Sequence, residues 1–152
     1  MYEIIDACQC FKEALTGTTR YWGNRILFEN NASHECKMNG DGYLLGVAFS
    51  KLMENAVKAS PMDLPVSVKL DTTRDRLKLV VRSGLTGSLP SDTGQRHRKF
   101  FNGSNDLEIL LIRSIAELHD GFLKITADES GDVVATISLP LTGTTEGFDA
   151  HW

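Results

Sequence analysis

The segment from Tyr43 to Ser60 places the strongest constraint on how this chain folds. Its apolar residues recur at helical spacing and would form one broad stripe, made of Leu44, Leu45, Ala48, Leu52, Met53 and Ala56. Asp41 comes just before the segment and can cap its first turn. We therefore predict a helix that follows Asp41, ends near Ala59 and is buried along one side.

Two polar residues near the end of this helix suggest a chemistry. Asn55 and Lys58 are three positions apart, so on a helix they share one face. An amide oxygen can bind Mg²⁺, and an ammonium group can meet a phosphate as a point charge. One hypothesis is a nucleotide-phosphate site with Asn55 as the metal ligand. The other is a polar helix face that is only solvated.

The composition narrows the class of protein. With 152 residues, of which 41% are hydrophobic, the chain suits one compact domain with a real core. Its net charge of -4 argues against a general nucleic-acid binder. The N-terminal segment carries Glu3, Asp6 and Glu13 and lacks a basic leader, so it does not resemble a signal peptide. No apolar run is long enough to span a membrane. We expect a cytoplasmic protein without membrane contact.

The three cysteines, Cys8, Cys10 and Cys36, leave one thiol unpaired in any disulfide scheme. Free thiols in a reducing cytoplasm therefore fit better than a disulfide. Together with His34 they could in principle bind zinc, but Cys8 and Cys10 would point in different directions on a helix. We expect core and surface thiols.

The rest of the chain alternates between helical and extended patterns. The expected helices span 2–15 and 107–119, and the expected strands span 25–29, 66–70, 77–81, 122–126 and 133–139. Residues 30–40 and 83–104 are predicted to be loops. This order predicts an α+β fold, a two-layer α/β sandwich with a mixed, mostly antiparallel sheet and helices on one face. It would form one domain over residues 1–141, followed by a polar, flexible tail at 142–152.

Five segments occur in an informative order: Gly40-Asp41 before Leu44-Leu45, Leu52 to Lys58, Val80-Val81-Arg82 before Gly87 and Pro90, Ile112 to Gly121, and Val134 to Leu141. In this order they resemble the catalytic and ATP-binding domain of sensor histidine kinases. That histidine kinase-like ATPase domain belongs to the GHKL superfamily of gyrases, chaperones, kinases and mismatch-repair ATPases. The resemblance implies a Mg-ATP site made by Asn55, Lys58, Ser83 and Gly87.

The chain departs from the family pattern where that site would read adenine. The family uses an aspartate followed by a Gly-x-Gly turn. Here Ser83 stands at the aspartate position and Leu85 at the first glycine, and only Gly87 remains. A serine hydroxyl is shorter and uncharged, so adenine recognition is expected to be weaker.

A second departure affects the phosphate side. The family's second glycine box aligns with Asp106-Leu107-Glu108-Ile109, where glycines would let the backbone approach phosphates at a helix N-terminus. Two carboxylates there would fill the space and repel a triphosphate. Lys51 lies one turn before Asn55, where the family has a polar or acidic group near magnesium. A cation at that position disfavours the metal, although it could pair with phosphate directly.

These departures predict a two-component signalling module that keeps the family's fold but has a degenerate ATP-binding site, needs no cofactor and is not an enzyme on its own. It would act through protein–protein interaction with a histidine kinase core, a response regulator or its own copy, and not with nucleic acid. One alternative is an active Mg-ATP-binding catalytic domain, with Asn55 on magnesium, Lys58 on phosphate and Ser83 in place of the aspartate. Another is the docking platform of a histidine phosphotransfer protein.

Three other groups are weighed against simpler explanations. The His34-Glu35 pair looks like a phosphoacceptor motif, but it lies in a predicted loop, and a solvated histidine explains it better. The basic run from Arg96 to Lys99 lies where the family has a lid over the nucleotide. It could clamp phosphate or dock an acidic partner, although a solvated loop is favoured. His119 is expected to cap the end of its helix.

Overall fold

The computed structural model describes residues 2–32, 36–60, 64–83, 106–127 and 132–142. The strands are β1 (Glu3–Asp6), β2 (Ile26–Asn31), β3 (Lys37–Gly40), β4 (Val66–Thr72), β5 (Arg76–Arg82), β6 (Phe122–Ala127) and β7 (Val133–Pro140). The helices are α1 (Ala7–Trp22), α2 (Gly42–Ala59) and α4 (Asp106–Leu118), with a short 3₁₀ turn, η1, at Gly23–Arg25.

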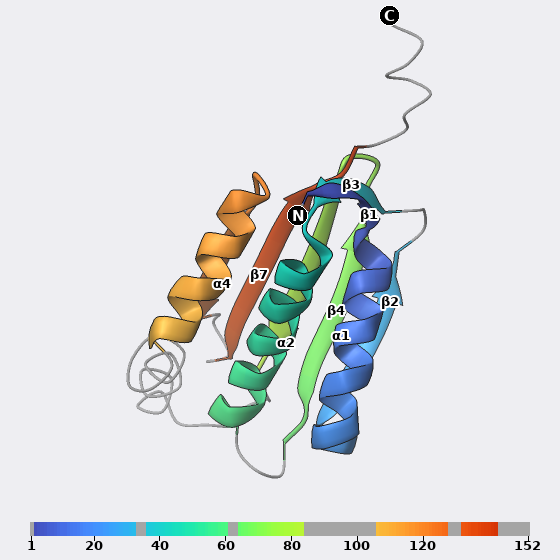
Figure 1. The fold of residues 1–152 in the computed structure, drawn as a ribbon. Helices are drawn as coiled ribbons and strands as arrows, with labels where there is room; N and C mark the ends of the chain where they lie inside the picture. Colours follow the sequence, from blue (N-terminus) through green and yellow to red (C-terminus); the bar gives the residue numbers. More distant parts are fainter. Residues whose placement is uncertain (1, 33–35, 61–63, 84–105, 128–131, 143–152) are drawn as a thin grey trace, which may run out of the picture.

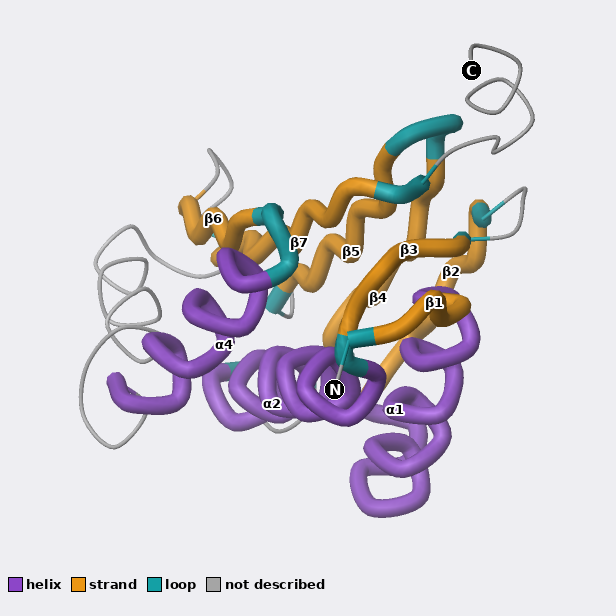
Figure 2. Tube along the Cα trace, turned by 45° about the horizontal axis from the view of Figure 1, so that its top comes forward, coloured by secondary structure: helices purple, strands orange, loops and turns teal. Residues whose placement is uncertain are grey.

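Five of these strands form the main sheet, in the order β2-β4-β5-β7-β6. The β2–β4 pair is parallel, and the other three pairs are antiparallel. β1 and β3 form a separate antiparallel pair. All three α-helices lie on one face of the main sheet (Figure 1), and the two layers are seen from another direction in Figure 2. The predicted α+β sandwich, with a mixed and mostly antiparallel sheet, is confirmed.

The core lies between these two layers. Alternate residues of the central strands face the helices and are buried: Val66, Val68 and Leu70 in β4, Leu77, Leu79 and Val81 in β5, and Ala135, Ile137 and Leu139 in β7. Helix α2 covers them with Leu45, Ala48, Phe49, Leu52, Met53 and Ala56. Each fully buried large aliphatic or aromatic side chain contributes about 1.5–3 kcal/mol. The buried side chains that alternate along the strands thus pack against the apolar side of α2.

Helix α2 begins where the sequence predicts. The Asp41 carboxylate accepts hydrogen bonds from the amides of Tyr43 at 3.0 Å and Leu44 at 3.1 Å. These bonds satisfy two amides that have no partner within the helix. At the other end, the Ser60 amide and hydroxyl both donate to the carbonyl of Ala56. The expected bounds of this helix are confirmed.

The N-terminal prediction is wrong at both ends of the helix. Residues Glu3–Asp6 form a strand, and α1 starts only at Ala7 and continues to Trp22. The Asp6 carboxylate accepts from the amides of Cys8 and Gln9, so Asp6 is the N-cap. Strand β3 was likewise predicted to be loop. Both short strands exist because they pair with each other, which local periodicity cannot reveal.

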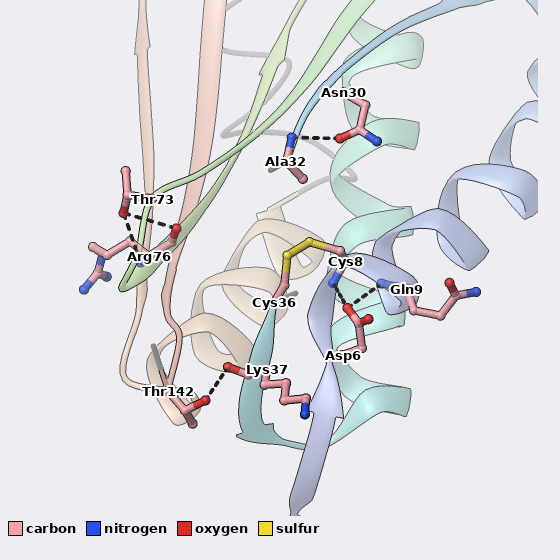
Figure 3. Close-up of a disulfide and its surroundings, with 10 residues drawn as sticks. All are labelled: Asp6, Cys8, Gln9, Asn30, Ala32, Cys36, Lys37, Thr73, Arg76 and Thr142. Atoms are coloured by element: carbon pink, nitrogen blue, oxygen red, sulfur yellow. Dashed lines mark hydrogen bonds between the residues drawn. A yellow bond between two sulfur atoms is a disulfide. The ribbon is translucent and has the colours of Figure 1, made fainter. Parts of the chain in front are cut away.

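This pairing also overturns the expectation of free thiols at Cys8 and Cys36. The β1–β3 register sets Asp6 opposite Lys37, and the Ala7 amide donates to the Cys36 carbonyl at 2.8 Å. The neighbouring cysteines, with Cα atoms 5.5 Å apart, form a disulfide across 28 residues of sequence (Figure 3). Cys10 remains a free, half-buried thiol.

His119 joins the ends of two helices. Its Nδ1 lies 2.8 Å from the Ile115 carbonyl in the last turn of α4, which confirms the expected capping role. Its Nε2 accepts a hydrogen bond from the Asp41 amide, at the start of α2. Because Nε2 is the acceptor, the ring carries its proton on Nδ1 and is neutral in this arrangement. Tyr2 stacks on the same ring, with the centroids 5.1 Å apart.

The C-terminal end of the described chain is also held in place. The Thr142 amide and hydroxyl both donate to the Lys37 carbonyl, at 2.8 and 3.0 Å (Figure 3). The predicted polar tail therefore begins with a residue bound to β3. Its remaining residues, 143–152, lie outside the described part of the chain.

Two glycines give a test of the packing. A Cβ on Gly121 would lie only 2.0 Å from the Ser138 carbonyl oxygen, a backbone atom, whereas a Cβ on Gly46 would meet nothing within 4 Å. Gly121→Ala should therefore destabilise the protein by about 2 kcal/mol or more, since β7 or the turn must shift. Gly46→Ala, in a helix interior, should stabilise it by about 0.5–1 kcal/mol. Urea unfolding measures both, and equal effects would contradict the packing described.

The disulfide predicts the behaviour of the thiols. Without reductant, the denatured protein should show one reactive thiol, and after reduction three. Burial raises the pKa of the native Cys10 thiol, and the Glu13 and Asp6 carboxylates raise it further. Native labelling of Cys10 should therefore be slower than that of a free thiol and should accelerate as the pH rises. Cys36→Ser should lower stability by about 2–4 kcal/mol, whereas the control Cys10→Ser should change it little.

Candidate nucleotide site

The C-terminal half of α2 carries the central residue of the candidate site. Asn55 belongs to the buried side of α2 and is 0% exposed. Neither its amide nitrogen nor its amide oxygen has a hydrogen-bond partner among the described residues. A buried carboxamide without partners costs about 1–3 kcal/mol. Asn55 therefore marks a place in the core where a polar partner would be stabilising.

An ion pair links α2 to α4 one turn before Asn55. The Lys51 ammonium lies 3.3 Å from the Glu108 carboxylate, and the two side chains are 33% and 29% exposed. Each of these residues departs from the family pattern in the sequence, but the sequence does not indicate that they pair. Because 57 positions separate them, only the packing of α4 beside α2 brings them together.

Ser83 follows the last residue of β5 and is buried, with 1% of its surface exposed. Its hydroxyl oxygen accepts a hydrogen bond from the Val133 amide at 3.0 Å, and its own amide donates to the Val133 carbonyl at 2.9 Å. These bonds continue the β5–β7 pairing past its last pair, Arg82 and Val134. In this arrangement the Ser83 hydroxyl is used to bind the backbone amide of Val133.

The other predicted site residues are described only in part. Lys58 is exposed at the end of α2 and makes no hydrogen bond or ion pair with any described residue. Asp106 begins α4, but its side chain is not described. The remaining predicted positions lie outside the described residues: His34, Glu35, Leu85, Gly87 and the run from Arg96 to Lys99.

The structure also has a groove that the sequence did not predict. It lies between α1 and α2, has a volume of about 440 Å³ and is lined by small and polar residues that include Cys10, Gly46 and Ser50. Tyr43, 79% exposed, stands at its rim. Lys51 reaches one side of this groove, but Asn55, Lys58 and Ser83 do not line it. The groove is therefore separate from the residues assigned to a nucleotide.

The comparison with protein families defines the class. The family of histidine kinase-, DNA gyrase B-, and HSP90-like ATPases matches residues 40–143, which include α2, the main sheet from β4 onward and α4. The chain therefore belongs to this ATPase family, as its motifs suggested. In the described part of the chain, no helix combines the length and the apolar character that crossing a membrane requires.

The curated relatives of the chain include sensor proteins. The chain is 24% identical over 124 residues to the sensor-like histidine kinase SenX3 of Mycobacterium tuberculosis, which covers 76% of this chain and 30% of the relative. It is 27% identical over 143 residues to the heme sensor protein HssS of Staphylococcus haemolyticus, covering 87% of this chain and 31% of the relative. The chain thus spans less than a third of the length of either protein.

Solved structures share the fold. The mycobacterial sensor histidine kinase MprB superposes with a TM-score of 0.70 at 22% identity, covering 95% of this chain and all of the other. The ATP binding domain of PrrB from Mycobacterium tuberculosis gives 0.67 at 20% identity, covering 93% and 98%. The family match and these superpositions agree on one fold, that of the histidine kinase-, DNA gyrase B-, and HSP90-like ATPases.

The Lys51–Glu108 pair can be tested by exchanging its charges. Lys51→Glu should lower stability because it places two carboxylates together, and adding Glu108→Lys should restore most of the loss. Because both side chains are about one-third exposed, we expect a coupling energy of roughly 0.5 kcal/mol. A double-mutant cycle by urea unfolding measures it at low and high salt. A coupling of zero at low salt would contradict the contact.

Proposed function

We propose that the chain is a two-component signalling module in which the histidine kinase ATPase fold serves as a protein-binding unit and does not take up Mg-ATP. The observation that carries the proposal is the ion pair between Lys51 and Glu108. It supplies from within the chain the charge balance that magnesium and phosphate would otherwise provide.

The position of Glu108 opposes phosphate binding. It lies in the first turn of α4, where free backbone amides and the helix dipole would attract an anion. Its carboxylate supplies that negative charge itself and is neutralised by Lys51. A triphosphate would have to separate this pair and then approach the carboxylate at close range. The charged residues on this side therefore do not fit a magnesium-bound triphosphate.

The position of Ser83 opposes adenine recognition. The amino group of adenine needs an acceptor, which the family supplies as a carboxylate. Ser83 offers only a hydroxyl, and one of its acceptor sites already holds the Val133 amide. With 1% of its surface exposed, the residue has little room for a second partner. Adenine would thus meet Ser83, which is bonded to Val133, and phosphate would meet Glu108, which is bonded to Lys51.

One observation favours the alternative, an active Mg-ATP-binding domain of a sensor kinase. The Asn55 carboxamide is buried and has no partner among the described residues, and its oxygen is a suitable magnesium ligand. In that alternative, magnesium would neutralise phosphate charge, Asn55 would hold the ion and Lys58 would bind phosphate.

The proposed partners follow from the relatives. Because SenX3 is a sensor-like histidine kinase and a similar structure is the cytoplasmic segment of the histidine kinase QseC, the module would contact a histidine kinase core, a response regulator or a second copy of itself in the cytoplasm. The chain spans less than a third of the length of the curated relatives SenX3 and HssS.

Calorimetric titration with Mg-ATP tests the proposal. We expect no binding tighter than about 100 μM, which corresponds to roughly 5–6 kcal/mol. A matched variant, Lys51→Asn with Glu108→Gly, removes the ion pair and should bind Mg-ATP more tightly than the natural chain.

The alternative predicts the opposite pattern. Tight binding by the natural chain, abolished by Asn55→Ala and weakened by Lys58→Ala, would replace the proposed function by the active domain. Lys58→Ala serves as the second variant because Lys58 is exposed, so its loss should leave the core intact.

A further inference from the structure

The face of the main sheet that points away from the helices carries an excess of basic residues. Its outward-facing charged side chains are Lys69, Arg76, Lys78, Arg82 and Lys124, against the acidic Glu29 and Asp71. The whole chain has a net charge of -4, so this face has the opposite sign to the molecule. We call it the basic sheet face.

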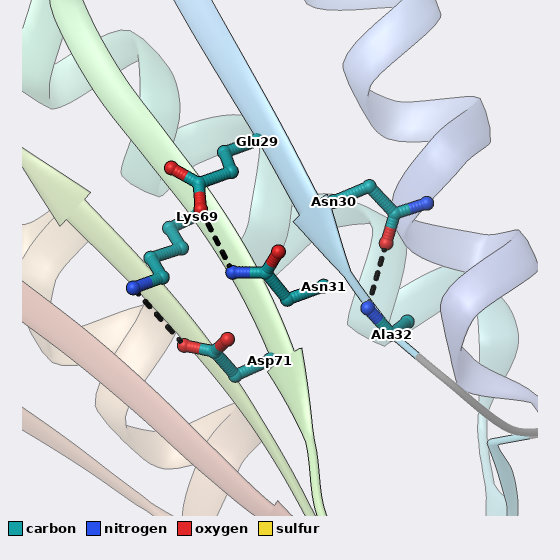
Figure 4. Close-up of polar contacts among 6 residues, drawn as sticks. All are labelled: Glu29, Asn30, Asn31, Ala32, Lys69 and Asp71. Carbon is teal, nitrogen blue, oxygen red and sulfur yellow. Dashed lines mark hydrogen bonds and ion pairs between the residues drawn. The ribbon is translucent and has the colours of Figure 1, made fainter.

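The acidic residues are confined to one side of this face. On β4, Asp71 pairs with Lys69 at 4.0 Å, and on β2, Glu29 accepts a hydrogen bond from Asn31 at 2.9 Å (Figure 4). At the far end of β5, Arg82 pairs with the buried Asp132 at 3.5 Å. Lys69 and Arg82 therefore each have an acidic partner.

Three basic residues on the β5–β7–β6 side of the basic sheet face keep their charge. Arg76, Lys78 and Lys124, on β5 and β6, have no acidic partner among the described residues. Arg76 and Lys78 alternate on one strand and are therefore about 6.5 Å apart. Lys124 lies two strands away and two residue pairs further along, at about 12 Å from Lys78.

Arg76 is held ready for a ligand. Its Nε donates to the Ser138 hydroxyl at 2.8 Å, and its guanidinium lies over the Phe122 ring, 5.9 Å from the centroid. Its two terminal nitrogens make no hydrogen bond to any described residue. A guanidinium fixed in this way loses little entropy on binding and offers a planar fork that suits a carboxylate. Phe122, 46% exposed, adds apolar surface beside it.

We propose that the basic sheet face is a docking surface for an acidic segment of another protein, bound in an extended conformation. Alternate side chains of an extended segment point the same way about 6.5–7 Å apart, which matches the spacing of Arg76 and Lys78. An acidic protein segment fits better than nucleic acid for two reasons. The net charge of -4 repels a long polyanion, and Phe122 is the one exposed aromatic among the described residues of this face.

This proposal does not depend on the absence of ATP. The basic sheet face points away from α2, the helix that carries both Asn55 and Lys51, because the helices cover the other face of the sheet (Figure 1). A failure here would leave the proposed function intact, and Mg-ATP binding would leave this face unchanged.

Fluorescence anisotropy with the full chain tests it. The probe is a labelled ten-residue peptide with glutamate at alternate positions, compared with the same peptide carrying glutamine and with a ten-nucleotide thymidine strand. We expect only the glutamate peptide to bind, and more weakly as NaCl rises from about 50 to 300 mM. Lys78→Gln with Lys124→Gln should lower its affinity about tenfold. Lys12→Gln, on the exposed side of α1, is the matched control and should have no effect.

Arg76→Lys tests the fork separately. It keeps the charge but removes bidentate binding, so it should weaken the glutamate peptide at least threefold without changing binding of the glutamine peptide. Thermal melting should show that the variants remain folded. If Arg76→Lys does not remain folded, the variant with Lys78→Gln and Lys124→Gln gives the decisive answer. No binding of the glutamate peptide, equal binding of the glutamine peptide, or an unaffected lysine double variant would overturn the proposal. Tighter binding of the oligonucleotide would also overturn it and assign the face to nucleic acid.

Discussion

Helix α2 is the element on which the rest of the structure depends, because its apolar side must be covered from three directions. β4 and β5 lie beneath it, and α1 and α4 flank it. Two polar contacts fix it further. The Asp41 amide at its start is held by His119 from the end of α4, and Lys51 in its middle is held by Glu108 from the start of α4. Any displacement of α4 therefore changes the environment of α2 along much of its length.

This arrangement explains why fold and chemistry can separate in such a domain. The helix that supplies the largest part of the core also carries Asn55, so the packing is retained whether or not a ligand binds. The stripe of Leu52, Met53 and Ala56 needs the sheet, not a nucleotide. The polar residues around it are under a different constraint. Each must find a partner inside the protein or outside it.

Local periodicity was sufficient to predict α2, α4 and the two antiparallel hairpins, since each has a buried side with a clear spacing. It failed for β1 and β3, which are four residues each and owe their existence to pairing across the chain. The disulfide was missed for the same reason. At the site, Lys51, Asn55, Ser83 and Glu108 could each be identified from the sequence. Their contacts could not, because the Lys51–Glu108 and Ser83–Val133 bonds join residues 57 and 50 positions apart.

The unpartnered Asn55 carboxamide and the Lys51–Glu108 ion pair do not carry equal weight as indications for or against a bound nucleotide. A neutral carboxamide without a partner costs about 1–3 kcal/mol, which a domain with a stability of about 5–15 kcal/mol can sustain. The bare presence of Asn55 in the core therefore gives weak support to a bound metal. The Lys51–Glu108 pair contributes less to stability, because both side chains are about one-third exposed, but a triphosphate would have to approach its carboxylate directly. The Lys51 ammonium and the Glu108 carboxylate balance each other's charge without a ligand. The electrostatics of the site consequently favour contacts within the chain, even though one of its residues still lacks a polar partner among the described residues.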